Sequence, residues 1–191
     1  MSGVSDSPPD PPPGTDADLR ARISDGDEAA FETLFRTHYD GLVRFANRLV
    51  QASMEAEELV QDVLLEVWVR RADLVANEDL KTYLFRATRN RALNHLRRRR
   101  LENLFRQSLP AEEPAVEQEG GGDLTATDAA IRTAIAALPD RCREVFVLSR
   151  QHDLTYAQIA ATMDISIKTV ETQMGRALKA LRVALEPLRG E

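Results

Sequence analysis

Apolar residues recur at spacings of three and four along two long stretches of this 191-residue chain, and this spacing limits the fold more than any other feature. It places the apolar side chains on one face of an α-helix. The first such series comprises Phe31, Leu34, Phe35, Tyr39, Leu42, Phe45, Ala46, Leu49 and Val50. A second comprises Leu59, Val63, Leu64, Val67 and Trp68. A third helix is expected from about residue 79 to residue 100, so the sequence predicts an all-α protein.

The second of these helices has an expected start at Ser53, whose hydroxyl would accept a backbone N–H as an N-cap. Glu55, Glu57 and Glu58 then fall in the first turn, where the helix dipole favours negative charge.

Composition divides the chain into two small helical domains. Residues 1–15 contain five prolines and few apolar residues, which predicts a disordered proline-rich tail. Residues 102–128 contain two prolines, the run Gly120–Gly122 and an excess of acids, which predicts a flexible acidic linker. The expected domains are therefore residues 16–101 and residues 129–191.

The net charge of −6 hides a strong sorting of charge along the sequence. No acid occurs between Tyr83 and Leu101, a stretch that holds Arg86, Arg89, Arg91 and Arg97–Arg100. On a helical projection, Phe85, Thr88, Ala92 and Leu96 share one face and the arginines and amides share the other. A helix with such a polar face suits a phosphate backbone, and the neighbouring aromatics can stack on unpaired bases.

Several classes of site are not expected. The single cysteine, Cys142, excludes an internal disulfide and a cysteine-based zinc site, and His38, His95 and His152 show no metal-ligand spacing. No apolar run approaches the roughly 18 residues of a membrane span, and no secretory signal is present. Phosphate-loop, nucleophile-elbow and metalloprotease motifs are also missing. We therefore expect a cytoplasmic, non-enzymatic protein without metal or cofactor.

The C-terminal part carries a helix-turn-helix pattern. Thr155 and Gln158 form a capping box that opens a helix with an inner face of Tyr156, Ile159, Ala160 and Met163. Ser166 caps a second helix, whose expected buried stripe is Val170, Met174, Ala177, Leu178 and Leu181. Its polar face is typical of a helix that reads the DNA major groove, where a carboxylate such as that of Glu171 can accept from cytosine.

Two segments resemble the bacterial sigma factors of the sigma-70 family. Residues 57–68 (EELVQDVLLEVW) resemble the polymerase-binding helix of region 2, and residues 80–97 are similar to the segment that melts and reads the −10 element. Residues 138–181 resemble region 4, which reads the −35 element. One departure is Tyr83, where tryptophan is common, and residues 76–79, where the family often captures a flipped base, have no distinctive pattern. The short polar linker leaves no room for region 3. A chain with regions 2 and 4 alone resembles the extracytoplasmic-function group.

The resemblance implies roles for individual residues. The clamp helices of the largest polymerase subunit would contact Glu57, Glu58, Gln61 and Asp62. The −10 strand would contact Lys81, Tyr83, Arg86, Arg89, Asn90, Asn94 and Arg97. The −35 duplex would contact Ser166, Lys168, Thr169, Glu171, Thr172, Arg176 and Lys179. Further implied partners are the flap of the second-largest polymerase subunit and an anti-sigma factor.

Two other classes of protein remain open on the residues alone. A stand-alone helix-turn-helix regulator would use residues 16–100 for sensing or dimerisation and would bind a palindrome without polymerase. A sigma-like decoy would bind an anti-sigma factor and no DNA.

Overall fold

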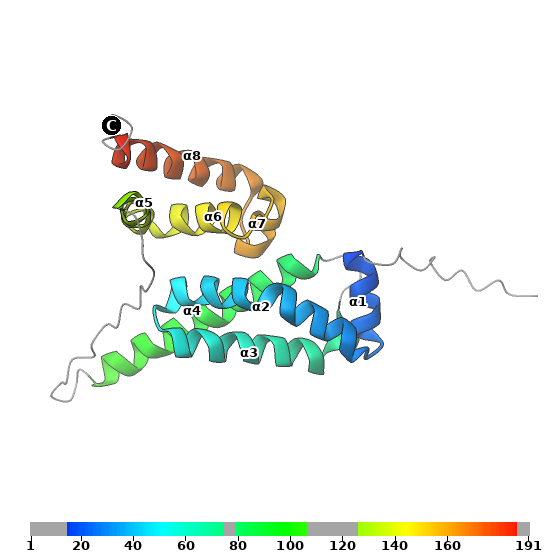
Figure 1. Cartoon of the computed structure of the whole chain (residues 1–191). Coiled ribbons are helices and arrows are strands. Elements are labelled where there is room, and N and C mark those ends of the chain that lie inside the picture. Colours follow the sequence, from blue (N-terminus) through cyan, green and yellow to red (C-terminus); the bar gives the residue numbers. More distant parts are fainter. Residues whose placement is uncertain (1–14, 75–78, 107–125, 187–191) are drawn as a thin grey trace, which may run out of the picture. The chain divides into compact units, whose positions relative to one another are not determined.

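The computed structural model describes residues 15–74, 79–106 and 126–186, and every element in these ranges is a helix (Figure 1). The prediction of an all-α fold is confirmed. The described residues form two compact units that divide at Arg100 and Leu101. The first unit contains α1 (Asp16–Ser24), α2 (Glu28–Val50), α3 (Ser53–Val69), the 3₁₀ turn η1 (Arg71–Asp73) and α4 (Leu80–Arg106) as far as Arg100. The second contains α5 (Ala126–Ala136), α6 (Asp140–Arg150), α7 (Tyr156–Met163) and α8 (Ile167–Ala184).

The core of the first unit lies between α2, α3 and α4. Phe45 of α2 meets Phe85 of α4 with ring centroids 5.3 Å apart, and both rings are almost fully buried. The remaining buried side chains of these helices include Leu34, Leu42, Val60, Val63, Val67, Leu84 and Ala92. The apolar stripe of α2 is wider than this core, because Phe35 is 37% exposed and stacks on Tyr39 at 4.7 Å.

The turn between α2 and α3 differs from the expectation in one respect. Helix α2 ends at Val50, and Gln51 follows in the left-handed conformation with φ 56°. The expected N-cap at Ser53 is wrong, because the N-cap residue is Ala52 and no side chain accepts a hydrogen bond there. Since packing against α2 fixes where α3 begins, a serine is not needed at the capping position. Glu55 does lie in the first turn.

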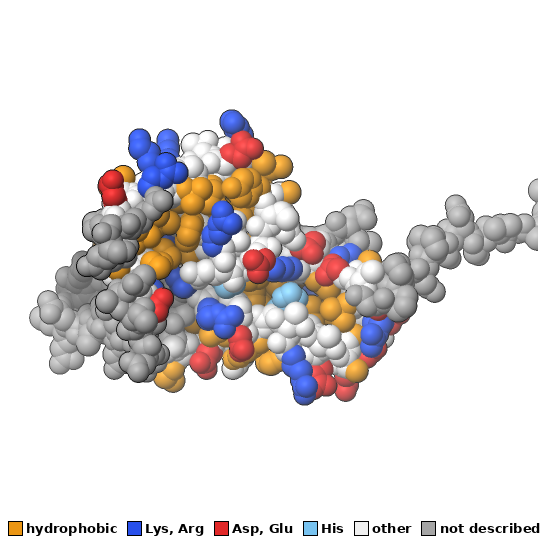
Figure 2. Space-filling view, turned by 45° about the horizontal axis from the view of Figure 1, so that its top comes forward, with side chains coloured by type: hydrophobic (Ala, Val, Ile, Leu, Met, Phe, Trp, Pro, Cys, Tyr) orange, Lys and Arg blue, Asp and Glu red, His pale blue; other side chains and the backbone are white. Residues whose placement is uncertain are grey.

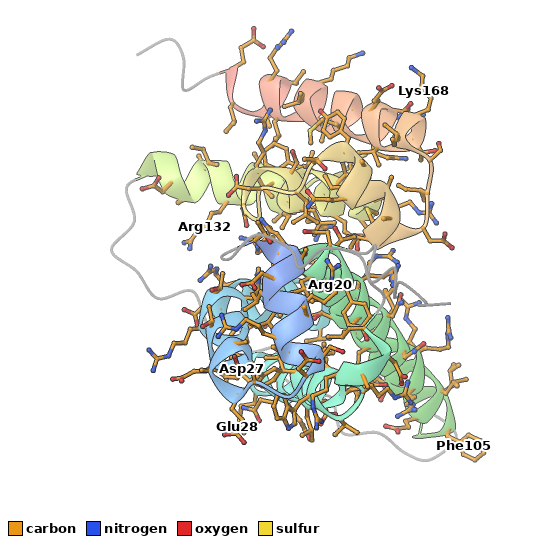
Figure 3. The ribbon with its side chains drawn as sticks, turned by 90° about the vertical axis from the view of Figure 1, so that its right-hand side faces the viewer. Arg20, Asp27, Glu28, Phe105, Arg132 and Lys168 are labelled. Atoms are coloured by element: carbon orange, nitrogen blue, oxygen red, sulfur yellow. The ribbon has the colours of Figure 1, made fainter. Side chains whose placement is uncertain are left out.

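Helix α4 extends beyond the residue at which a linker was expected. It continues to Arg106, with Leu101, Leu104 and Phe105 exposed, and Phe105 is seen at its end in Figure 3. Helix α5 begins at Ala126, inside the expected linker range of 102–128. The remainder of that linker and the proline-rich tail lie outside the described residues, so the domain limits remain predictions. None of the helices in the described ranges has the length and apolarity that a membrane span requires.

The second unit contains the expected helix-turn-helix in α7 and α8. The Thr155 hydroxyl accepts from the backbone N–H of Gln158, and the Gln158 side chain accepts from the backbone N–H of Thr155, so the capping box is present. Helix α7 ends at Met163, and Asp164 follows in the left-handed conformation. The Ser166 hydroxyl caps α8 by accepting from the N–H of Thr169 at 3.1 Å. Both predicted caps are confirmed.

The buried stripe of α8 is narrower than predicted. Val170, Met174, Ala177 and Leu181 are buried as expected, whereas Leu178 is 42% exposed. On a helical projection, Leu178 lies about 70° from the mean direction of these four buried residues. It therefore stands at the border of the face of α8 that the short neighbouring helices cover. Tyr156 is likewise 37% exposed, because it begins α7 at the edge of the packed face.

The capping box predicts a measurable loss of stability in the variant Thr155→Ala. Removing an N-cap hydroxyl costs about 0.5–2 kcal/mol, so the melting temperature of the second unit should fall by several degrees. Calorimetry of the full chain measures this shift. Thr133→Ala is the matched control: its exposed hydroxyl donates to the carbonyl of Ala129 within α5, and because alanine is the better helix former, its removal should not lower the melting temperature. Equal melting temperatures for Thr155→Ala and the parent chain would contradict a stabilising cap.

Candidate nucleic-acid interfaces

A groove runs between α3 and α4 on the surface of the first unit. Its volume is about 310 Å³, at the small end of the range for ligand sites. Its lining comprises Val63, Glu66 and Val67 of α3 with Tyr83, Arg86, Ala87, Asn90, Arg91 and Asn94 of α4. The structure thus brings four residues expected at the −10 strand, Tyr83, Arg86, Asn90 and Asn94, into one place.

The chemistry of this groove suits an unpaired base. Tyr83 is half-buried, and the guanidinium carbon of Arg86 lies 5.9 Å from the centre of its ring, within cation–π distance. The exposed amides of Asn90 and Asn94 supply both donors and acceptors. The other expected −10 residues lie outside the groove lining: Lys81 and Arg89 are half-buried and Arg97 is exposed.

Acidic side chains of α3 pair with one side of the basic helix α4. The Arg91 guanidinium donates to the carboxylate of Asp62 at 2.7 Å and to that of Glu66 at 3.1 Å. One turn further along, the Glu55 carboxylate contacts His95 at 2.9 Å and Arg99 at 3.1 Å. Arg91 and Arg99 are therefore partly neutralised from α3, and Arg91 belongs to this paired edge although it also lines the groove.

Sequence reasoning missed these pairs, although a signal for them exists. The partners lie 25 to 44 residues apart, beyond any local pattern. However, Glu55, Asp62 and Glu66 follow one another at intervals of seven and four, so they share one face of α3. An acidic face on one helix beside an arginine-rich neighbour predicts that the two charged faces meet.

The residues expected to contact polymerase divide into two sets on α3. Glu57 and Gln61 are exposed, and the Gln61 amide lies 3.5 Å from the Tyr39 hydroxyl. Glu58 and Asp62 line a second groove of about 440 Å³. The other residues of this second groove are Glu55, Leu59, Arg91, Asn94, His95 and Arg98. Asp62 is the member of the expected set that already has a cationic partner, Arg91, within the chain.

The polar face of α8 is the second candidate surface. Lys168, Glu171, Thr172, Arg176 and Lys179 are exposed. Figure 3 shows Lys168 pointing away from α7, and Figure 2 shows lysine and arginine side chains gathered at the upper edge of the view. The Lys168 ammonium contacts Glu171 at 3.0 Å, and the Thr172 hydroxyl donates to the carbonyl of Lys168. Ser166 and Thr169 are committed to the cap, with their hydroxyl oxygens 2.8 Å apart.

Charged and titratable groups gather at the N-terminal end of α4. One carboxylate oxygen of Asp79 accepts from the backbone N–H and the hydroxyl of Thr82, at 2.8 and 2.6 Å. His38 of α2 lies nearby. Burial lowers the pKa of His38 below its usual 6.5, the charge of Lys81 lowers that pKa further, and Asp16 and Asp79 oppose the shift. His38 is therefore neutral at pH 7.

Comparisons with known proteins identify both units. The Sigma-70 region 2 model matches residues 34–102, and the Sigma-70, region 4 model matches residues 128–181. The ECF RNA polymerase sigma factor RpoE of Cereibacter sphaeroides is 31% identical over 169 residues, which are 86% of this chain and 91% of that protein. The RNA polymerase sigma-E factor of Streptomyces coelicolor is 30% identical over 162 residues, 84% of this chain and 88% of that protein.

Solved structures agree with this assignment. The sigma factor RpoE of Bartonella quintana, solved in complex with the anti-sigma factor NepR, is 26% identical with a TM-score of 0.63, over 82% of this chain and 96% of that chain. CnrH, solved with the cytosolic domain of CnrY, shares the fold, with a TM-score of 0.66 at 24% identity over 90% of this chain and 97% of that chain.

A region 2 unit with a polar groove and a region 4 helix-turn-helix together define a sigma-type initiation factor. The chain belongs to the extracytoplasmic-function group of the sigma-70 family. As a sigma factor it binds core RNA polymerase and directs promoter-specific initiation of transcription. The region 2 match is not accounted for by a stand-alone helix-turn-helix regulator.

The lowered pKa of His38 predicts a pH dependence of stability. As the pH falls through 6.5, the unfolded chain binds a proton at this position and the folded chain does not, so stability present above pH 6.5 is lost between pH 6.5 and the lower folded pKa. We expect His38→Gln to weaken the decline in unfolding free energy between pH 8 and pH 5. Urea unfolding followed by the fluorescence of Trp68, the single tryptophan, measures the first unit.

His152→Gln is the control for this experiment, because His152 lies in the second unit. It should leave the pH dependence of the Trp68 transition unchanged. A His38→Gln chain with the same pH dependence as the parent chain would contradict the assignment.

Proposed function

We propose that the groove between α3 and α4 receives a base of the −10 strand while the promoter opens. The observation that supports this most is the convergence of Tyr83, Arg86, Asn90 and Asn94 on one groove. The ring of Tyr83 offers a stacking surface, the Arg86 guanidinium a positive charge, and the two amides hydrogen bonds to base edges. Lys81, Arg89 and Arg97, which lie outside the groove lining, would contact phosphates of the same strand.

The free-energy cost of moving a base out of the duplex is similar in size to the gain from stacking it on an aromatic side chain. Moving a base out of the duplex costs a few kcal/mol, and stacking on an aromatic side chain returns about 1–3 kcal/mol per base. A small unit held on polymerase is therefore able to shift the equilibrium toward open DNA without consuming a nucleotide. For this reason we propose that the chain is not an enzyme and needs no cofactor.

We propose that α8 reads the −35 element from the major groove. Glu171 would accept from the amino group of a cytosine, and Lys168, Arg176 and Lys179 would contact phosphates. The Lys168–Glu171 pair is no obstacle, because the lysine side chain is 86% exposed and exposed pairs contribute little free energy. Ser166, Thr169 and Thr172 would then act near the start of the helix, where the cap fixes their positions.

We propose that the exposed acidic face of α3, with Glu57, Glu58, Gln61 and Asp62, binds the clamp helices of the largest polymerase subunit. The second unit would contact the flap of the second-largest subunit. Because both proposed contacts are with RNA polymerase, we propose that the chain acts in the cytoplasm. We also propose an anti-sigma partner, since the Bartonella relative of the same fold was solved with one.

The groove assignment predicts a loss of promoter opening in Tyr83→Ala and Arg86→Ala. Loss of one stacked base of about 1–3 kcal/mol lowers open-complex formation by roughly 5- to 150-fold. Permanganate probing of the −10 region in holoenzyme complexes measures the opened bases. Arg36→Ala is a matched control, because Arg36 of α2 is 77% exposed, pairs with Glu32 and lies outside the groove. Wild-type opening in both groove variants would contradict the assignment.

The α8 assignment predicts two separable effects at the −35 element. Glu171→Gln should weaken discrimination at one base pair by about 1–3 kcal/mol, because an amide no longer selects the cytosine amino group. Lys179→Ala should weaken binding to all −35 sequences and reduce the salt slope by about 1. Transcription from a library of −35 sequences at two salt concentrations separates these effects. Unchanged base preference in Glu171→Gln would show that this carboxylate reads no base.

A further inference from the structure

The first turn of α4 is held by a carboxylate from a distant helix. The first N–H groups of a helix have no partner within the helix, so they need acceptors from elsewhere. Thr82 receives a local acceptor, Asp79. Leu80, the first residue of α4, donates its N–H instead to the Oδ2 atom of Asp16 at 3.1 Å, across 64 residues of sequence.

Asp16 is itself held firmly on α1. The same Oδ2 atom accepts from the Arg20 guanidinium at 2.6 Å, and the Arg20 side chain is only 10% exposed. One oxygen is therefore shared between a buried cation and the N-terminus of α4. A carboxylate at this end also complements the positive end of the helix dipole.

Helix α1 is fixed to the body of the first unit at its other end. Ile23 is fully buried, and the Arg22 guanidinium pairs with Asp27, the N-cap residue of α2, at 2.8 Å. Figure 1 shows α1 lying across the end of α2 and α3, and Figure 3 labels Arg20 and Asp27 on this side of the unit. A rigid chain of contacts thus runs from α2 through α1 to the start of α4.

We infer that Asp16 is a positioning residue for −10 recognition. Tyr83, a residue of the groove, lies three residues beyond the backbone N–H of Leu80, so the bond from that N–H to Asp16 sets where Tyr83 stands in the groove. The inference rests on the proposed function of the groove. Asp16 itself is not assigned a contact with DNA, and its effect is transmitted through the backbone of α4.

The test compares Asp16→Ala, Asp16→Asn and the control Asp18→Asn in reconstituted holoenzyme. Alanine removes both bonds of Asp16, whereas asparagine keeps an oxygen that accepts from Leu80 and loses only the charge. Asp18 is on the same helix turn but pairs with Arg22 within α1. The readouts are affinity for core polymerase, permanganate-detected opening, and relative transcription from a library of −10 sequences, all below the unfolding transition followed by Trp68.

We expect Asp16→Ala to bind core polymerase normally, to open promoters roughly tenfold less, the order of one lost base stack, and to show flattened −10 preferences. Asp16→Asn should recover most of the opening, and Asp18→Asn should match the parent chain. If Asp16→Ala fails to fold, Asp16→Ser, whose shorter side chain does not reach the N–H of Leu80, carries the test through its −10 preferences. A positioning role predicts that those preferences shift, whereas a purely stabilising role predicts parent-like preferences in the folded protein.

Tyr83→Ala in the same assay separates the proposed −10 groove from the positioning role of Asp16. Defective opening in Tyr83→Ala with parent-like opening and −10 preference in Asp16→Ala would overturn the positioning role and leave the groove assignment intact. Parent-like behaviour of Tyr83→Ala would overturn the groove assignment itself. Parent-like −10 preference in a folded Asp16→Ser, with Asp16→Ala unfolded, would also overturn the positioning role.

Discussion

Burial of one face of α4 against α2 and α3 determines which of its side chains meet the solvent. Phe85, Thr88 and Ala92 are at most 2% exposed, and Phe85 packs directly on Phe45. Because these residues lie on one side of the helix, the rotation of α4 about its own axis has a single solution. Arg86, Asn90 and Asn94 follow from it on the opposite side of the helix.

The charges on α3 and α4 then determine which ligands the exposed side of α4 can bind. Arginines in a continuous series repel one another and attract any polyanion. The acids of α3 pair with Arg91, His95 and Arg99 along one edge of α4, and Tyr83, Asn90 and Asn94 line the proposed −10 groove. The same carboxylates lie beside Glu57 and Glu58, which places the proposed polymerase surface and the proposed −10 groove on adjacent faces of two helices. Such proximity is a physical basis for coupling polymerase binding to promoter opening.

The sequence predicted the features that depend on local chemistry. The caps at Thr155 and Ser166 were readable because donor and acceptor lie three residues apart. The predicted Ser53 cap was wrong, because the start of α3 is fixed by packing against α2 and not by a capping side chain. Leu178 shows a similar limit: periodicity gives the direction of a side chain but not how far a small neighbouring helix extends to cover it.

Contacts between distant segments were beyond the sequence reasoning. Nothing local relates Asp16 to Leu80 or Glu55 to Arg99, because both pairs depend on how three helices pack. The four residues of the −10 groove could be predicted as one face of α4, but the apolar floor from Val63 and Val67 could not. The family resemblance implied the roles of these residues, and the packing of α3 against α4 forms the groove around them.

Run-off transcription on fragmented genomic DNA, with the purified chain, core polymerase, or both, tests directly whether this chain directs core polymerase to promoters. We expect discrete transcripts only when both components are present, with start sites that share one −35 and one −10 sequence. Core polymerase that gains no new start sites, together with a palindromic footprint from the chain alone, would contradict it.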